Sequence, residues 1–266
     1  MIRPTAPRGH AVVTGASSGI GAEIARQLAA RGHPLTLVAR RRDRLDALAA
    51  ELHAQGTRAD VVELDLARPD AAPQLHAAVR AAGHPVEILV NNAGFGLQGR
   101  FIEHDFAAIE EMVRLNILTL THLTRLFAHD MVEARHGYIL QVSSAAAFLP
   151  SPYVAAYAAT KHYVKAFSEA IRYELRHTGV SVTTLYPGIT RTEFNTVAGA
   201  RTPPLMNLSV LDAATVARVG LRAMRRRRRA VVPGLINKLN AIFSEALHRG
   251  FITRTAGRLL EDANGH

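Results

Sequence analysis

The chain has 266 residues and no cysteine, and its 32 lysines and arginines against 22 aspartates and glutamates give a net charge of +10. This length suits one α/β domain, residues 1–266, with a sizeable core, and the absence of cysteine excludes a disulfide framework, thiolate chemistry and a cysteine-ligated metal. The chain has no uninterrupted apolar run of about 18 residues to span a membrane and no apolar signal segment near its start, so we expect a cytoplasmic protein.

Arginine is concentrated in two runs, at residues 40–42 and 225–229. A basic cluster is one mark of a nucleic-acid-binding protein, but no helix-turn-helix, zinc finger or aromatic RNA-binding motif accompanies these runs. We therefore expect solvated faces and no nucleic-acid partner. Attraction to anionic lipid or to an acidic carrier protein is the alternative that the charge leaves open.

Short apolar runs alternate with stretches of helical periodicity along the chain. We predict strands at residues 10–14, 35–39, 59–64, 86–91, 138–142, 180–185 and 230–232, and helices at residues 20–31, 42–55, 72–82, 106–134, 153–177 and 212–226. This alternation predicts an α/β fold, a Rossmann-like doubly wound and mostly parallel seven-stranded sheet with helices on both faces. Ligands of such sheets bind beyond the carboxyl ends of the strands.

The first predicted strand runs into the glycine-rich sequence TGASSGIG at residues 14–21. Gly15 permits a tight turn, Gly19 lets a ligand approach the backbone, and Gly21 allows the helix to pack closely on the strand. The free amides at the start of that helix can hold a pyrophosphate. The spacing differs from the G-x-G-x-x-G of other dinucleotide folds, and an ordinary strand–helix connection is the alternative.

Three arginines, Arg40, Arg41 and Arg42, follow the second predicted strand, and no acidic residue occurs there before Asp43. Enzymes of this architecture that use NAD place an acid at this point to hold the ribose 2′-hydroxyl. Arginine instead suits a 2′-phosphate, and cations at a helix start oppose the helix dipole. We therefore predict that NADP(H) is preferred over NAD(H), mainly through Arg40 with Arg41 in support; a solvated loop is the alternative.

Tyr157 and Lys161 lie four residues apart in a predicted helix, so both side chains project from one face. Tyrosine is a poor acid or base near neutral pH because its ordinary pKa is about 10, and an adjacent ammonium should lower that pKa. Lysine is scarce, since the chain has only Lys161, Lys165 and Lys238. The pair has the parts of a proton-transfer device, and a solvated pair on a helix surface is the alternative.

Further motifs occur in order, each after a predicted strand or in the helix that follows it. They are NNAG at residues 91–94, Asn116, the pair Ser143 and Ser144 with Ser144 thirteen residues before Tyr157, and Pro187-Gly188 followed by Thr192. Together with the glycine turn and the Tyr–Lys pair, they make the chain resemble the short-chain dehydrogenase/reductase family. The resemblance runs from about residue 10 to residue 192, and more loosely to residue 233.

The resemblance implies hydride transfer between a nicotinamide and a carbonyl or secondary alcohol, without a metal. It makes Tyr157 the general acid or base and gives Lys161 the nicotinamide ribose hydroxyls. Ser144 would donate a hydrogen bond to the substrate oxygen, and Asn116 would hold a water that connects Lys161 to solvent. A serine that caps the strand end and a polar residue inside a helix are the alternatives for Ser144 and Asn116.

The same motifs give the predicted cofactor contacts. These are Gly15, Ser17, Ser18, Gly19, Ile20, Gly21, Arg40, Arg41, Asp65, Leu66, Asn92, Ala93, Gly94, Tyr157, Lys161, Pro187, Gly188, Thr190 and Thr192. Asp65 follows the third strand and resembles the family residue that contacts the adenine, although it could simply cap the next turn.

The substrate is predicted only as a class. The resemblance implies a substrate loop at about residues 188–211, and the candidate lining residues are Phe95, Leu97, Ala146, Phe148, Tyr153, Phe194 and Met206. Most are apolar, which favours a small hydrophobic carbonyl or alcohol, although plain core residues are the alternative. A non-catalytic NADP-binding sensor or scaffold is the competing function.

Assembly is predicted from helices that are apolar on more than one face, because the second face must be covered. For residues 106–134 and 153–177 we expect a sister subunit as the cover, in a homodimer or homotetramer, and the chain's own tail is the alternative. That tail, about residues 235–262, has the spacing of an amphipathic helix. We expect it to pack against the body or a sister subunit, and contact with a membrane surface is the less favoured alternative.

Overall fold

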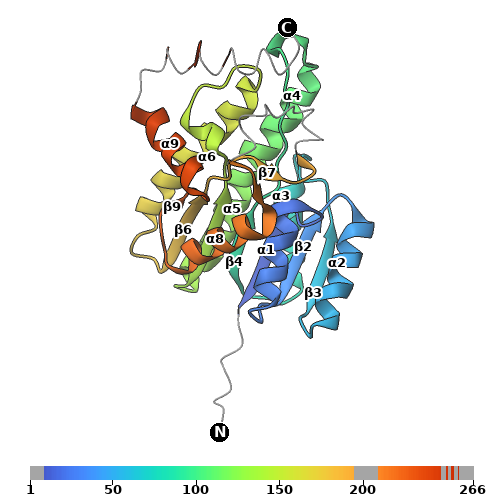
Figure 1. Cartoon of the computed structure of the whole chain (residues 1–266). Helices are drawn as coiled ribbons and strands as arrows, with labels where there is room; N and C mark the ends of the chain where they lie inside the picture. Colours follow the sequence, from blue (N-terminus) through green and yellow to red (C-terminus); the bar gives the residue numbers. More distant parts are fainter. Residues whose placement is uncertain (1–8, 195–208, 247–249, 251–252, 255–256, 258–266) are drawn as a thin grey trace.

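The computed structural model describes residues 9–194, 209–246, 250, 253, 254 and 257. Its centre is a seven-stranded sheet in the order β3-β2-β1-β4-β5-β6-β9, in which every strand pair is parallel (Figure 1). The strands are β1 His10–Thr14, β2 Leu35–Ala39, β3 Ala59–Glu63, β4 Val86–Asn91, β5 Gly137–Val142, β6 Val180–Leu185 and β9 Ala230–Val231. The predicted doubly wound sheet of seven strands is confirmed.

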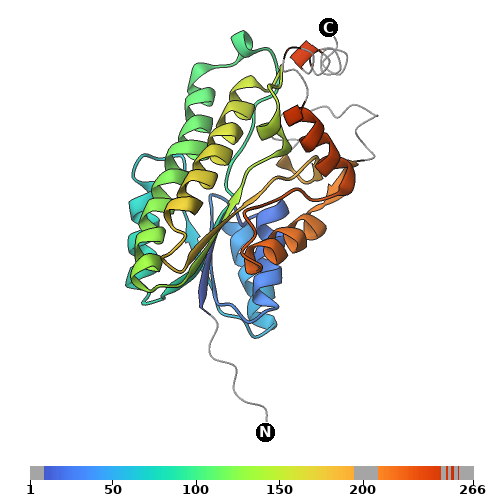
Figure 2. The same ribbon diagram turned by 90° about the vertical axis from the view of Figure 1, so that its left-hand side faces the viewer.

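Helices cover both faces of this sheet (Figure 2). The helices α1, α2 and α8 contribute to the hydrophobic core on one face, and α3, α5 and α6 contribute to the core on the other. Their bounds are α1 Gly19–Ala29, α2 Arg42–Ala54, α3 Ala71–Ala81, α4 Phe106–Val113, α5 Leu120–Glu133, α6 Ala155–Glu174, α8 Ala213–Arg225 and α9 Leu235–Ala246. Double coverage explains why β1, β2 and β6 are buried at every residue, including the serine and threonines of β6.

The strand order reverses at β1, which pairs with β2 on one side and with β4 on the other. In open α/β sheets, ligands bind outside the carboxyl ends of the strands at such a reversal. The glycine-rich turn follows β1 and the motif at residues 91–94 closes β4, so the fold brings these two distant parts of the sequence to the same edge.

The helix predicted for residues 106–134 is confirmed from Phe106 to Glu133, but it is not α-helical throughout. Between α4 and α5 the chain forms a π-helix, η2 Arg114–Thr119, which contains the fully buried Asn116. A π-helix widens the turn and often occurs at functional sites. Its physical cause here is tertiary, because the Asn116 side chain bonds to segments outside its own helix.

The helix predicted for residues 153–177 is shorter than expected, since α6 begins at Ala155 and ends at Glu174. Tyr153 has a φ angle of +62°, which is incompatible with continuing the α-helix towards the N-terminus. Tyr153 therefore lies in the turn before α6 and not on the helix face that carries Tyr157.

The predicted substrate loop is tied together at its two ends. β7 Thr190–Arg191 pairs in parallel with β8 Leu211–Asp212, and the Leu211 amide donates to the Ile189 carbonyl at 3.1 Å. Residues 195–208, including the predicted lining residue Met206, lie outside the described residues.

Helix α9 is amphipathic, but its apolar side faces away from the body of this chain. Leu235, Leu239 and Phe243 are 73%, 44% and 57% exposed, whereas Asn237 and Ala241 are buried. For the described part of the tail, the prediction that its apolar stripe packs on the body is therefore wrong. Contact of that stripe with a sister subunit or with a membrane surface stays a prediction. None of the described helices has the length and apolar character that crossing a bilayer requires.

At the amino end of the sheet, His10 is buried and stacks on His84 with ring centroids 4.5 Å apart. Its Nε2 lies 2.7 Å from the Thr36 hydroxyl oxygen. Burial, followed by the nearby His84, lowers the pKa of His10 from 6.5 to about 4.

This burial predicts a loss of stability in mild acid. Below pH 6.5 the unfolded chain protonates His10 while the folded chain does not, so the free energy of unfolding falls until the pH reaches about 4. Between pH 7 and pH 5 the loss from this group is about 2 kcal/mol. Urea unfolding at both pH values should show a smaller loss in His10→Gln than in the native chain, whereas the exposed His129→Gln should behave as native. Equal losses in His10→Gln and the native chain would contradict the assignment.

Candidate active site

The glycine-rich turn is shaped by contacts that leave no room for a side chain. A Cβ on Gly21 would lie 2.2 Å from the Gly15 carbonyl oxygen, and a Cβ on Gly15 would lie 2.9 Å from the Ala93 Cα. Gly15 also has a φ angle of +67°, which glycine adopts without strain. The turn after β1 is therefore packed directly against the segment that follows β4.

Hydrogen bonds fix this packing. The Thr14 hydroxyl oxygen accepts from the amides of Asn92 and Ala93 at 3.0 and 3.1 Å. The Asn92 side-chain amide donates to the carbonyls of Thr14 and Gly15 at 3.0 and 3.2 Å. Thr14 was not among the predicted site residues, although its place at the carboxyl end of β1 was a usable signal.

The start of α1 fits an anionic group. Ser18 is the N-cap residue, but its side chain makes no capping hydrogen bond, and the first turn contains no acidic residue. The first amides of the helix and its positive dipole end are therefore unopposed by a carboxylate of that turn. With the crowded glycines beside them, these residues fit the diphosphate of a dinucleotide, and Ser17 to Gly21 would hold it.

The arginines after β2 take different directions. Arg41 donates to the Ser17 hydroxyl at 3.0 Å and to the Ser18 hydroxyl at 2.8 Å, so it reaches the glycine turn. Arg40 instead pairs with Glu111 of α4 at 3.2 Å, and Arg42 pairs with Asp46 in its own helix. A further arginine that was not predicted, Arg44, joins Arg41 in binding Glu193, as described below.

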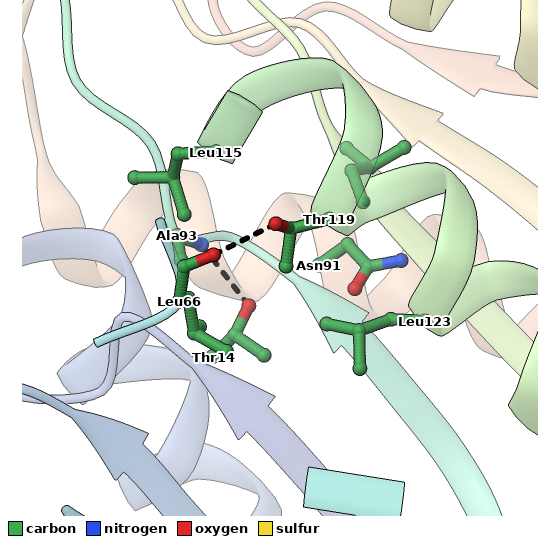
Figure 3. Close-up of a pocket in the computed structure, with 8 residues that line it drawn as sticks. Thr14, Leu66, Asn91, Ala93, Leu115, Thr119 and Leu123 are labelled. Carbon is green, nitrogen blue, oxygen red and sulfur yellow. Dashed lines mark hydrogen bonds between the residues drawn. The ribbon is translucent and has the colours of Figure 1, made fainter. Parts of the chain in front are cut away.

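A small pocket lies between the ends of β1 and β4 and the π-helix η2 (Figure 3). Its lining residues are Thr14, Leu66, Asn91, Ala93, Leu115, Thr119, Leu120 and Leu123. The Thr119 hydroxyl donates to the Leu66 carbonyl at 2.7 Å, which fixes the chain just after β3. Asp65 accepts from the Ala67 amide at 3.0 Å, so its side chain makes the turn-capping contact that the sequence left open.

Ser144, Tyr157 and Lys161 come together beyond β5. The Ser144 hydroxyl lies close enough to the Tyr157 phenol to act on its pKa, and the Ser144 oxygen accepts from the Ala146 amide at 3.1 Å. Lys161 is buried, with its Nζ 5.7 Å from the centroid of the Tyr157 ring, and it donates to the Val142 carbonyl at 3.1 Å. The strand end and one face of α6 thus position the predicted catalytic set.

The protonation states differ from the sequence expectation. Burial raises the pKa of Tyr157 to about 12, with the nearby Ser144 hydroxyl acting in the opposite direction. Burial lowers the pKa of Lys161 to about 8. The expectation that the adjacent ammonium lowers the tyrosine pKa is therefore wrong for this structure, because desolvation of the phenol outweighs the other effects. Tyr157 is neutral at neutral pH and can give a proton.

Asn116 connects the π-helix to this set. Its side-chain amide donates to the Phe95 carbonyl at 2.9 Å and to the Thr160 hydroxyl at 3.1 Å, and its oxygen accepts from the Phe95 amide at 3.3 Å. A Cβ on Gly94 would lie 2.8 Å from that oxygen and 3.5 Å from the Lys161 Nζ. The structure therefore brings Gly94, Asn116 and Lys161 together as the sequence predicts; the water-holding role of Asn116 stays a prediction.

The predicted lining residues divide into two groups. Phe194 lies over the site, with its ring centroid 5.6 Å from that of Tyr157. Phe148 instead packs on Tyr186 at 4.7 Å and lies under the Lys165 ammonium at 4.9 Å, as expected of a structural residue. The others that the structure describes, Phe95, Leu97, Ala146 and Tyr153, are partly buried.

The last motif contacts both the site and the tail. The Pro187 carbonyl accepts from the Ala145 amide at 2.8 Å, and the Thr190 hydroxyl donates to the Gly188 carbonyl at 3.0 Å. Thr192 lies over the glycine turn, since a Cβ on Gly19 would meet its Cγ2 at 3.0 Å.

Asn237 of α9 holds the chain around this motif, and the sequence analysis did not single it out. Its side-chain amide donates to the carbonyls of Pro233 and Ser209, both at 3.1 Å. A Cβ on Gly188 would lie 2.6 Å from the same side chain. Asn237 thus joins the start of α9 to the segments on either side of residues 195–208.

We predict that Asn237→Ala lowers the free energy of unfolding by about 1–3 kcal/mol, because two carbonyls lose a buried donor. Asn240→Ala on the exposed side of the same helix is the matched control and should change it by less than about 0.5 kcal/mol. Urea unfolding measures both. If the two variants are equally stable, the role given to Asn237 is wrong.

Comparisons with known proteins agree with this geometry. A family model described as short chain dehydrogenase matches residues 9–202. A short chain dehydrogenase of Pseudocercospora fijiensis is 36% identical over 185 residues, which are 69% of this chain and 60% of that protein, so the match spans less than two thirds of the relative.

Solved structures match over more of the chain. A short-chain dehydrogenase from Sphingobium yanoikuyae in complex with NADPH is 32% identical with a TM-score of 0.79, covering 92% of this chain and 95% of that one. The bulky-bulky ketone specific alcohol dehydrogenase from Comamonas testosteroni is 30% identical with a TM-score of 0.78, covering 92% and 94%.

Proposed function

Since the chain belongs to the short-chain dehydrogenase family, we propose that it is an NAD(P)-dependent oxidoreductase acting on alcohol or carbonyl groups, and that it reduces a hydrophobic carbonyl with NADPH, with Tyr157 as the general acid. The observation that carries this proposal is the convergence of Ser144, Tyr157 and the buried Lys161, whose Nζ lies 5.7 Å from the centroid of the Tyr157 ring. The cofactor, when bound, supplies or accepts the hydride, so the protein must position the reactants and handle one proton.

In the proposed reaction, Tyr157 donates its proton to the substrate oxygen, which suits a phenol whose pKa of about 12 keeps it neutral. Ser144 bonds to the same oxygen and stabilises the charge that develops there. The tyrosinate that remains is stabilised by the Ser144 hydroxyl and by the positive charge of Lys161. Asn116 bonds to both the loop after β4 and the helix α6 and so fixes their relative position, which keeps Tyr157 and Lys161 beside that loop.

We predict that Tyr157→Phe lowers kcat by about 10²–10⁴, because a positioned proton donor is lost, while NADPH still binds. Tyr163→Phe is the matched control, since Tyr163 lies on the same helix and bonds only to Thr121 at 2.9 Å among the contacts of the described chain. The measurements are NADPH oxidation across a panel of carbonyl compounds and NADPH binding by fluorescence. A folded Tyr157→Phe enzyme with near-native turnover would exclude Tyr157 as the acid.

The arginines after β2 support a preference for NADP(H). Arg41 is the better placed of the two predicted residues, because it already reaches Ser17 and Ser18 of the glycine turn, whereas Arg40 pairs with Glu111. A guanidinium suits the 2′-phosphate through both its charge and its forked donors.

We therefore predict that the native chain has a kcat/KM at least about tenfold higher with NADPH than with NADH. Arg41→Ala should remove most of this preference and Arg40→Ala a smaller part. Arg42→Ala, which breaks only a contact within α2, is the control and should leave the ratio of the two kcat/KM values unchanged. A native preference for NADH would reject the assignment.

The substrate class is proposed from the aromatic cover of the site. Phe194 lies against Tyr157, and Phe95 and Leu97 follow the β4 motif, so the reacting group would be approached past apolar surface. The ketone specificity in the name of the Comamonas relative agrees with this class. Turnover of any carbonyl compound in the panel would also separate the enzyme from the competing hypothesis, a dinucleotide-binding sensor.

We also propose a homodimer or homotetramer that covers the outer face of η2 and α6. Leu118 at the end of η2 is 54% exposed and Tyr163 of α6 is 36% exposed, so apolar side chains of both elements reach the surface. A closed symmetric assembly would bury the same patch on each partner.

A further inference from the structure

Glu193 binds two arginines that lie about 150 residues earlier in the chain. Both of its carboxylate oxygens are 2.7 Å from Nη1 of Arg44, and Oε2 is also 2.8 Å from Nη1 of Arg41. The side chains are half exposed, at 47% for Glu193 and 41% and 42% for the arginines. One carboxylate thus bridges the segment after β7 to the start of α2.

The same arginine is the best-placed candidate for the cofactor 2′-phosphate. Arg41 has a fixed number of donors, of which Nε and Nη2 bond to the serines of the glycine turn and Nη1 bonds to Glu193. A phosphate monoester and a carboxylate compete for such guanidinium donors, because both are oxyanions of similar geometry. The phosphate carries a charge of about −2 and the carboxylate −1.

We propose that Glu193 occupies the 2′-phosphate-binding arginines and sets the selectivity between NADP(H) and NAD(H), and that Arg44 is a third phosphate-binding residue. This inference rests on the proposed dinucleotide function. A cofactor with a 2′-phosphate must displace the Glu193 carboxylate from Arg41 and Arg44, whereas NAD(H) leaves the bridge in place. Glu193 therefore weakens the binding of NADP(H) and has little effect on NAD(H).

The bridge also connects the cofactor site to the substrate site. The neighbour on one side, Thr192, lies over Gly19 of the glycine turn, and the neighbour on the other side, Phe194, packs on Tyr157. If a phosphate displaced Glu193 from the arginines, the residue between Thr192 and Phe194 would lose its contacts. Thr192 touches the glycine turn and Phe194 touches the proton donor Tyr157. NADP(H), but not NAD(H), would loosen the segment of these three residues.

The test is Glu193→Gln in the full-length protein, with the dissociation constants of NADP⁺ and NAD⁺ measured by calorimetry. The variant keeps the size of the side chain and removes its charge. We expect NADP⁺ to bind about two- to fivefold more tightly, the range for screened, half-exposed charges, and the dissociation constant of NAD⁺ to stay unchanged. Arg44→Ala should weaken NADP⁺ alone. Asp46→Asn, which removes the same charge from a partner of Arg42 on α2, is the matched control and should change neither constant.

The outcomes separate this inference from the cofactor proposal. A native chain that prefers NADP⁺, with no gain in Glu193→Gln, overturns the role of Glu193 and leaves the proposed function intact. A native preference for NAD⁺ that Glu193→Gln shifts towards NADP⁺ supports the role of Glu193 and rejects the proposed native preference. Weaker binding of NADP⁺ by the variant, or an equal gain in Asp46→Asn, overturns the inference. Hydrogen exchange of residues 190–194 is the second readout and should be faster with NADP⁺ bound than with NAD⁺ bound.

Discussion

The side-chain amide of Asn116 holds together three parts of the molecule on which the active site depends. It bonds to the backbone of Phe95 through both its oxygen and its nitrogen, and it donates to Thr160 of α6. The loop after β4 and the helix that carries Tyr157 and Lys161 are thereby fixed to the same residue. A fully buried amide must satisfy its donors and acceptor within the protein. The widened π-helical turn is the backbone arrangement that lets it do so.

Burial then decides the chemistry of the two ionisable groups that Asn116 helps to position. Removing a phenol and an ammonium from water favours the neutral form of each, so the pKa of Tyr157 rises to about 12 while that of Lys161 falls to about 8. The neutral phenol is the form that gives a proton to a carbonyl oxygen. Oxidation of an alcohol would need the tyrosinate, and among the described residues Ser144 is the group that opposes the effect of desolvation on the pKa of Tyr157. In the proposed reaction, these protonation states would suit reduction.

The sequence predicts the parts of this arrangement that depend on local pattern. Each strand is a short apolar run ended by glycine or polar residues, and parallel strands bring those ends to one edge, so the turn at Gly15–Gly21, Ser144 and the Tyr157–Lys161 pair could be placed in advance. The π-helix could not, because the pattern of residues 106–134 is that of an ordinary helix and the cause is a contact with Phe95 and Thr160. The outward face of α9 was missed for a similar reason. Its stripe predicts burial, but the tertiary bonds of Asn237 turn the polar side inwards.

The contacts of Glu193 belong to the same class, since no local pattern links it to arginines 149 and 152 positions away. They show why the segment after β7 cannot be assigned to the substrate alone. Its three consecutive residues, Thr192, Glu193 and Phe194, touch the glycine turn, the arginines after β2 and the ring of Tyr157. A group that binds at one of these three places would change the contacts of one residue of the segment, and the other two residues lie next to it or one position further along the chain. Under the proposed function, cofactor and substrate would therefore be coupled through these three consecutive residues. Of their three contacts, the exposed ion pairs of Glu193 with the arginines are weakened by solvent, so a bound anion would displace them most easily.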